Sequence, residues 1–120
     1  MIKQNLHCHT TFDDGADTPE EMVTAAVSAG LTSLGISAHS PVPGEVWCVS
    51  EENEPRFKAE LHRLREKYRG LIDVYCGLEY DSRSAQRFEG YDYVIASVHT
   101  LAGTTIDNTV EEARQVIEHY

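Results

Sequence analysis

Two histidines separated by one residue stand near the start of the chain, directly after a short segment that can form only a strand. His7 and His9 follow residues 1–6, and Asp14 comes soon after in a glycine-containing turn. Residues two apart in a strand point to the same face, so we expect both imidazoles to stand side by side where the strand ends. Imidazoles and a carboxylate that converge there can hold a divalent transition metal. A pair of ordinary surface histidines is the alternative.

Three further segments repeat this layout, in which an apolar run of strand-like length and composition ends at a potential metal ligand. The runs cover residues 34–38, 72–78 and 93–98, and they end at His39, Glu79 and His99. In a sheet of parallel strands joined by helices, the carboxyl ends of the strands lie on one side, where ligand sites are built. Repetition in four strands therefore argues against chance. We predict that one mouth gathers His7, His9, Asp14, His39, Glu79 and His99.

Helical patterns separate the predicted strands. The first has Thr18 as N-cap, Pro19 in its first turn and Gly30 at its end. Its predicted buried stripe is Met22, Ala25, Ala26 and Ala29. The second covers about residues 54–68, and its predicted buried face is Phe57, Leu61, Leu64 and Tyr68.

His62 falls off the second buried face, so we interpret it as solvated. We expect a loop or short helix over residues 77–90 and a third helix from about Thr109. The element order βαβαββα predicts an α/β fold with a largely parallel sheet.

Composition limits the classes of protein. The chain has 120 residues, which is one domain or part of one, and a net charge of −10, which argues against nucleic-acid binding through a basic face. No run approaches the ~18 apolar residues of a membrane helix, and the N-terminus does not resemble a signal sequence. The odd number of cysteines, three, favours reduced thiols in the cytoplasm, with Cys8 as a core thiol.

Four segments resemble, in order, the motifs of the polymerase and histidinol phosphatase (PHP) superfamily, and its histidinol-phosphatase branch in particular. They are LHCHTTFDDG (6–15), TSLGISAHSP (32–41), GLEYD (77–81) and YDYVIASVH (91–99). The resemblance implies a distorted β/α barrel with up to three metal ions at the carboxyl ends of its strands. Family members are roughly twice this length, in keeping with the size of closed β/α barrels, and their second half supplies further ligands. We therefore interpret residues 1–120 as the N-terminal portion of a PHP domain, truncated near Tyr120 and incomplete as a barrel.

The resemblance also assigns roles to the candidate ligands. It implies that His7 and His9 bind the first metal and that Glu79 bridges the first and second. His99 would bind the second metal, while Asp14 and His39 would serve the third. Glu79, Asp14 and His39 are the implied catalytic residues. The implied cofactors are divalent ions (Zn, Mn or Fe), and the implied reaction is hydrolysis of a phosphate monoester by a metal-bound hydroxide.

Three functions remain open at this point. The first is a histidinol-phosphatase-like hydrolase of a small phosphorylated substrate in histidine biosynthesis. The second is a PHP-type nuclease or nucleotide phosphatase, and the third is a non-catalytic metal-binding fragment. The chain end fits a truncated product, an observed portion of a longer protein, or one part of a split assembly. We expect the 120 residues alone to be nearly inactive and to self-associate through the open sheet edge.

Two residues outside the motifs are candidates for substrate binding. Trp47 lies in the polar segment 41–54 after His39, where it could form a lid over the mouth or pack against the following helix. Arg83 follows Glu79 and could reach a phosphate or remain a solvated surface charge.

Overall fold

Four parallel strands form the central sheet of the protein. The structure is a computed structural model that describes residues 2–98, 100–101 and 104–105. The strands pair in chain order: β1 (Gln4–Asn5), β2 (Ser33–His39), β3 (Asp73–Asp81) and β4 (Tyr93–Ser97). Every pairing in this sheet is parallel, as predicted. A small antiparallel hairpin, β5 (Thr100–Leu101) and β6 (Thr104–Thr105), was not anticipated.

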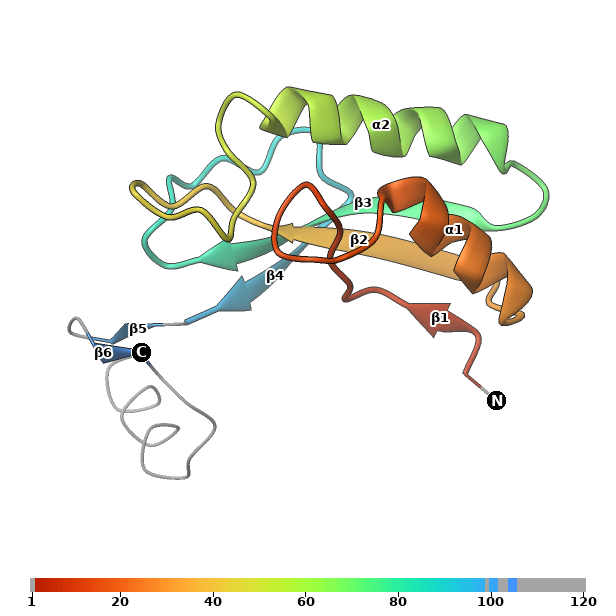
Figure 1. Ribbon diagram of the computed structural model, residues 1–120, viewed down its shortest axis with the longest axis horizontal. Coiled ribbons are helices and arrows are strands. Elements are labelled where there is room, and N and C mark those ends of the chain that lie inside the picture. Colours follow the sequence, from red (N-terminus) through yellow and green to blue (C-terminus); the bar gives the residue numbers. More distant parts are fainter. Residues whose placement is uncertain (1, 99, 102–103, 106–120) are drawn as a thin grey trace.

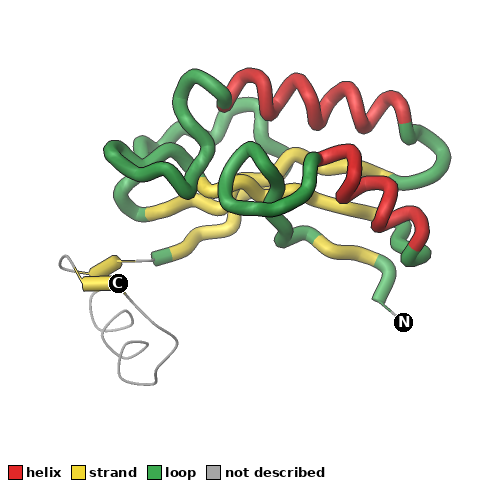
Figure 2. The backbone as a smooth tube through the Cα atoms, viewed as in Figure 1, coloured by secondary structure: helices red, strands yellow, loops and turns green. Residues whose placement is uncertain are grey.

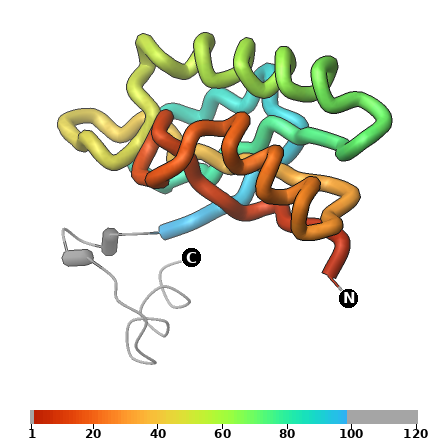
Figure 3. Tube along the Cα trace, turned by 45° about the vertical axis from the view of Figure 1, so that its right-hand side comes forward, coloured from red at the N-terminus to blue at the C-terminus, as the bar shows by residue number. Residues whose placement is uncertain are grey.

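The two described helices connect the first three strands and lie on the same face of the sheet (Figures 1, 2 and 3). Helix α1 (Pro19–Ser28) joins β1 to β2, and helix α2 (Glu54–Lys67) joins β2 to β3. This placement divides the sheet into a helix-covered outer face and an inner face. None of the described helices is long and apolar enough to cross a membrane.

The core lies between the outer face and the helices. Its fully buried side chains come from alternate strand positions and from one face of α2: Leu34, Ile36, Val74, Phe57, Leu61 and Leu64. Burying each such side chain contributes roughly 1.5–3 kcal/mol of transfer free energy. The predicted stripe of α2 is therefore confirmed, with Tyr68 packed at its end and His62 exposed.

Helix α1 begins as predicted but packs on a different stripe. Thr18 and Glu21 form a reciprocal capping box, and Gly30 ends the segment with φ +81°. The buried residues are Pro19, Val23 and Ala26, whereas Ala25 and Ala29 are exposed. The prediction was wrong for these two alanines, because turning Val23 inward removes more apolar surface from water than burying Ala25 or Ala29 would.

The loop predicted over residues 77–90 starts later than expected. Strand β3 continues through Glu79 to Asp81, because residues 77–81 pair with β4 on one side while 73–79 pair with β2 on the other. Regular structure is absent between Asp81 and Tyr93. The third predicted helix lies outside the described residues.

Candidate metal centre

The centre begins with two residues that face each other across neighbouring strands. His39 ends β2 and is paired in register with Glu79 of β3. Paired residues of parallel strands point to the same face, and this pair lies on the inner face, opposite the helices. His39 Nδ1 lies 2.8 Å from Glu79 Oε2, and the side chains are only 10% and 5% exposed. A buried carboxylate of this kind needs a positive or hydrogen-bonding partner, which the imidazole provides.

The histidine pair reaches the same place from the end of β1. Strand β1 comprises only Gln4–Asn5, so His7 and His9 lie beyond it. Cys8 between them points into the core, as predicted, and its thiol donates to Gly35 O at 3.2 Å. The two imidazoles therefore point the other way, with ring centroids 5.3 Å apart.

His7, His9 and Glu79 form the first group of potential ligands. His9 Nε2 lies 3.5 Å from Glu79 Oε1, and His7 Nε2 is in direct contact with the same oxygen. One ligand atom from each residue lies within 4.8 Å of the others. Two imidazole nitrogens and a carboxylate oxygen at such separations fit a zinc-like divalent cation.

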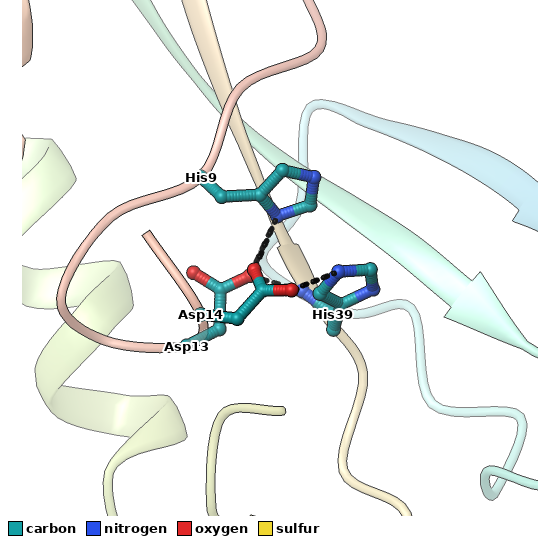
Figure 4. A group of neighbouring side chains, drawn as sticks. All are labelled: His9, Asp13, Asp14 and His39. Carbon is teal, nitrogen blue, oxygen red and sulfur yellow. Dashed lines mark hydrogen bonds and ion pairs between the residues drawn. The ribbon is translucent and has the colours of Figure 1, made fainter. Parts of the chain in front are cut away.

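The second group consists of His9, Asp13, Asp14 and His39, whose ligand atoms also lie within 4.8 Å of one another (Figure 4). His39 Nε2 lies 3.2 Å from Asp14 Oδ2, and His9 Nδ1 lies 3.6 Å from Asp14 Oδ1. The stacked rings of His9 and His39, 4.3 Å apart, connect this group to the first.

Asp13 was missed by the sequence reasoning. Its fully buried carboxylate accepts hydrogen bonds from His9 Nδ1 at 2.7 Å, from the His39 N–H at 3.0 Å and from the Thr10 N–H at 3.1 Å. Burial favours the neutral acid, but these donors outweigh it and hold the pKa of Asp13 below its usual value. The hydrogen bond between Asp13 and His9 Nδ1 raises the pKa of His9, although burial acts in the opposite direction. The sequence signal for Asp13 was its place directly before Asp14 in the glycine-containing turn, which gives that turn two acidic residues.

Of the two candidate substrate residues, Trp47 packs against His39 and Arg83 lies over the Trp47 ring. The Trp47 ring meets the His39 ring edge to face, with centroids 5.1 Å apart, and its Nε1 donates to Glu45 at 2.8 Å. The Arg83 guanidinium lies 5.6 Å from the Trp47 ring centroid and donates to the buried Asp81 carboxylate at 2.9 and 3.1 Å. Arg83 is therefore anchored and not a free surface charge.

Five of the six predicted ligands thus come together: His7, His9, Asp14, His39 and Glu79. The sixth, His99, lies outside the described residues. The contacts among the five join three separate stretches of chain, at the carboxyl side of β1, β2 and β3.

A profile of the PHP domain matches residues 5–120. The chain belongs to the PHP family. Its four-stranded sheet with helices on one face corresponds to part of the β/α barrel of PHP proteins, as the structural comparison below shows.

This PHP chain is similar to proteins with more than one activity. It is 34% identical over 114 residues to a probable histidinol-phosphatase of Deinococcus radiodurans, covering 85% of this chain and 44% of the relative. It is 28% identical to ribonuclease P protein component 3 of Methanococcoides burtonii, covering 81% and 48%.

A solved structure of a Lactococcus lactis histidinol phosphate phosphatase, in complex with zinc, L-histidinol and phosphate, superposes with a TM-score of 0.73 at 26% identity. The match covers 95% of this chain and 49% of that one. The chain thus spans about half the length of these relatives.

Proposed function

We propose that this chain is the N-terminal portion of a metal-dependent phosphoric monoester hydrolase of the histidinol-phosphatase type, acting in histidine biosynthesis in the cytoplasm. The observation that carries the proposal is the position of the buried Glu79 carboxylate. One of its oxygens faces His7 and His9, and the other faces His39. Similarity to a probable histidinol-phosphatase and to a phosphatase complexed with histidinol and phosphate supports this substrate class. On this proposal, residues 1–120 are part of a PHP domain that other residues complete.

We assign His7, His9 and Glu79 to a first metal and Asp14 and His39 to a third, with Glu79 and His99 serving a second. Zinc, manganese or iron, in up to three positions of the complete protein, suits these imidazole and carboxylate donors. When bound, such cations would supply a water of lowered pKa as the nucleophile for phosphorus and would neutralise phosphate oxygens.

Other residues of the chain orient the candidate ligands and the substrate. Asp13 holds His9 Nδ1 by a hydrogen bond and so leaves Nε2 directed at Glu79. Trp47 and Arg83 together form a wall next to His39. The Trp47 ring packs against the His39 ring, and Arg83 lies over the Trp47 ring and is fixed by Asp81. We propose that this wall contacts the organic part of the substrate, with the Arg83 charge close enough to favour an anion.

The alternative is a PHP-type nuclease, which similarity to a ribonuclease P component favours. A net charge of −10 disfavours it, because long nucleic acids are bound chiefly through positive charge on the protein.

The deciding experiment uses the complete protein after removal of metal with a chelator. We expect hydrolysis of histidinol phosphate to return on addition of Zn²⁺, Mn²⁺ or Fe²⁺, with little hydrolysis of bis(p-nitrophenyl) phosphate, a diester. Turnover of the diester alone would favour the nuclease, and turnover that needs no metal would reject both proposals.

The substrate wall is tested in the same assay. Trp47→Ala is expected to raise KM for histidinol phosphate several-fold, whereas Trp47→Phe, which keeps an aromatic face, should raise it less. An unchanged KM in both variants would remove Trp47 from the substrate site.

A further inference from the structure

Tyr93 lies across the inner face of the sheet, over two glycines. It begins β4 and is paired in register with Gly77 of β3. A Cβ atom added at Gly77 would lie 2.3 Å from the Tyr93 ring, and one added at Gly35 of β2 would lie 2.1 Å from its hydroxyl oxygen. Such approaches are impossible for any residue larger than glycine. Both glycines thus provide the space in which the tyrosine spans β3 and β2.

The Tyr93 hydroxyl ends at the histidine pair. It donates a hydrogen bond to the carbonyl of Leu6, the residue directly before His7. Burial raises the pKa of this hydroxyl, so it remains a protonated donor at neutral pH. A side chain from β4 therefore touches the segment that carries His7 and His9.

The segment from Leu6 to His9 needs such contacts because sheet pairing does not hold it. Strand β1 ends at Asn5, and its register with β2 covers only Gln4 and Asn5. Beyond that point two contacts come from β2: Ser37 N–H donates to Cys8 O at 3.0 Å, and the Cys8 thiol donates to Gly35 O. Both of these act on Cys8. The Tyr93 bond acts on the carbonyl of the peptide that joins Leu6 to His7, while the N–H of this peptide donates to Asn5 Oδ1 at 3.0 Å. The Tyr93 bond therefore helps to set the direction in which His7 leaves the strand.

We propose that Tyr93 is a positioning residue for the metal site: its hydroxyl holds the Leu6 carbonyl and thereby sets the placement of His7 against Glu79. This inference rests on the proposed metal-dependent function. His7 needs such support because its side chain is 53% exposed, whereas that of Glu79 is 5% exposed. Without the hydrogen bond from Tyr93, His7 gains conformational freedom. Metal binding is then weakened by the entropy lost when His7 is ordered.

The test is metal affinity in the complete protein, with Tyr93→Phe compared with Tyr91→Phe. Tyr91 is a matched control because its half-buried hydroxyl also donates one hydrogen bond, to Glu54 Oε2 at 2.8 Å, next to helix α2. Affinity for Zn²⁺ is measured by competition with a chelator, and Co²⁺ absorption reports on ligand geometry. We expect Tyr93→Phe to weaken Zn²⁺ binding by about 10-fold or more, the usual effect of losing a residue that orients a metal ligand, and to alter the Co²⁺ spectrum. Tyr91→Phe should leave both unchanged.

A second variant displaces the hydroxyl without removing it. Gly35→Ala should weaken Zn²⁺ binding, because its methyl group occupies the position of the tyrosine hydroxyl. In the Tyr93→Phe background the same substitution should lower Zn²⁺ affinity by less than it does in the wild type, because the hydrogen bond is already lost and only the closer approach to ring carbons, at 2.8 and 2.9 Å, remains. Denaturant unfolding of the metal-free variants separates these effects from general loss of stability.

The outcomes distinguish this inference from the function on which it rests. A wild-type protein that binds no Zn²⁺ would overturn the metal site itself. Wild-type binding that Tyr93→Phe retains in full, or that Tyr91→Phe weakens equally, would overturn the positioning role alone.

Discussion

Glu79 and Asp13 are both buried carboxylates of the centre, but they face different partners. Glu79 offers one oxygen to His7 and His9 and the other to His39. Asp13 accepts hydrogen bonds from a histidine ring and two backbone N–H groups. A carboxylate whose two oxygens face several imidazoles suits metal binding, whereas one that accepts several N–H donors suits orientation of a ligand.

Replacing Glu79 with Gln should lower the metal content of the protein more than replacing any one histidine. The amide keeps the volume but loses the charge and offers a single oxygen, so both of the metals assigned to Glu79 should bind more weakly. In the complete protein, elemental analysis should show lower metal content for Glu79→Gln than for His39→Ala. Full metal occupancy in the Gln variant would exclude the bridging role.

Asp13→Asn should weaken metal binding by roughly 10-fold to 100-fold, the range found for residues that orient ligating histidines. Asparagine is neutral and offers a single acceptor oxygen, so the His9 ring is held less firmly with Nε2 toward Glu79. Asp17→Asn is a matched control, because it removes an exposed carboxylate from the same loop. Equal Zn²⁺ affinities for both variants would show that Asp13 has no part in orienting His9.

Helices α1 and α2 are joined at their outer surface by a cluster of charges around Glu20. This α1 carboxylate accepts bonds from three α2-side groups: Lys67, Arg63 at 2.9 Å and the Tyr68 hydroxyl at 2.9 Å. These donors, Lys67 first, lower the pKa of Glu20 to about 2. Because the cluster is solvent-exposed, we expect salt to weaken it.

Glu20→Gln should destabilise the protein slightly, and the difference from wild type should depend on pH. Because the folded pKa is depressed, the stabilisation is fully present above the unfolded pKa of about 4.3 and is lost as pH falls toward 2. Denaturant unfolding at pH 7, 4 and 2.5 measures this. Glu66→Gln is the control, since Glu66 pairs with Arg69 of the same turn and does not join the two helices. A pH-independent difference for Glu20→Gln would contradict the assigned cause.

At the scale of the whole molecule, the described sheet is open at β4. This strand pairs with β3 alone within the central sheet, and Val94 on its outer side is 39% exposed. A four-stranded parallel sheet is too small to close into a barrel, and unpaired strand edges attract further strands.

The isolated 120-residue chain is therefore expected to self-associate and to hydrolyse phosphomonoesters poorly. Five described ligand residues shared among the proposed metals leave most positions short of the three or four ligands that zinc-like ions prefer. Sedimentation analysis and a phosphatase assay with added Zn²⁺ or Mn²⁺ check both points. A monomer with enzyme-like turnover would contradict this expectation.

The sequence by itself predicted the starts of α1 and α2, the strand that ends at His39, and five candidate ligands that the structure brings together. Those features are local, because a Thr-Pro start, a C-terminal glycine or a histidine after an apolar run is legible within a few residues. Tertiary structure decided the rest. The inward turn of Val23, the continuation of β3 to Asp81, the burial of Asp13 and the span of Tyr93 over Gly35 and Gly77 all depend on contacts between distant segments. Sequence periodicity cannot resolve such contacts, because they arise from how the packed surfaces meet and not from any one segment's preference.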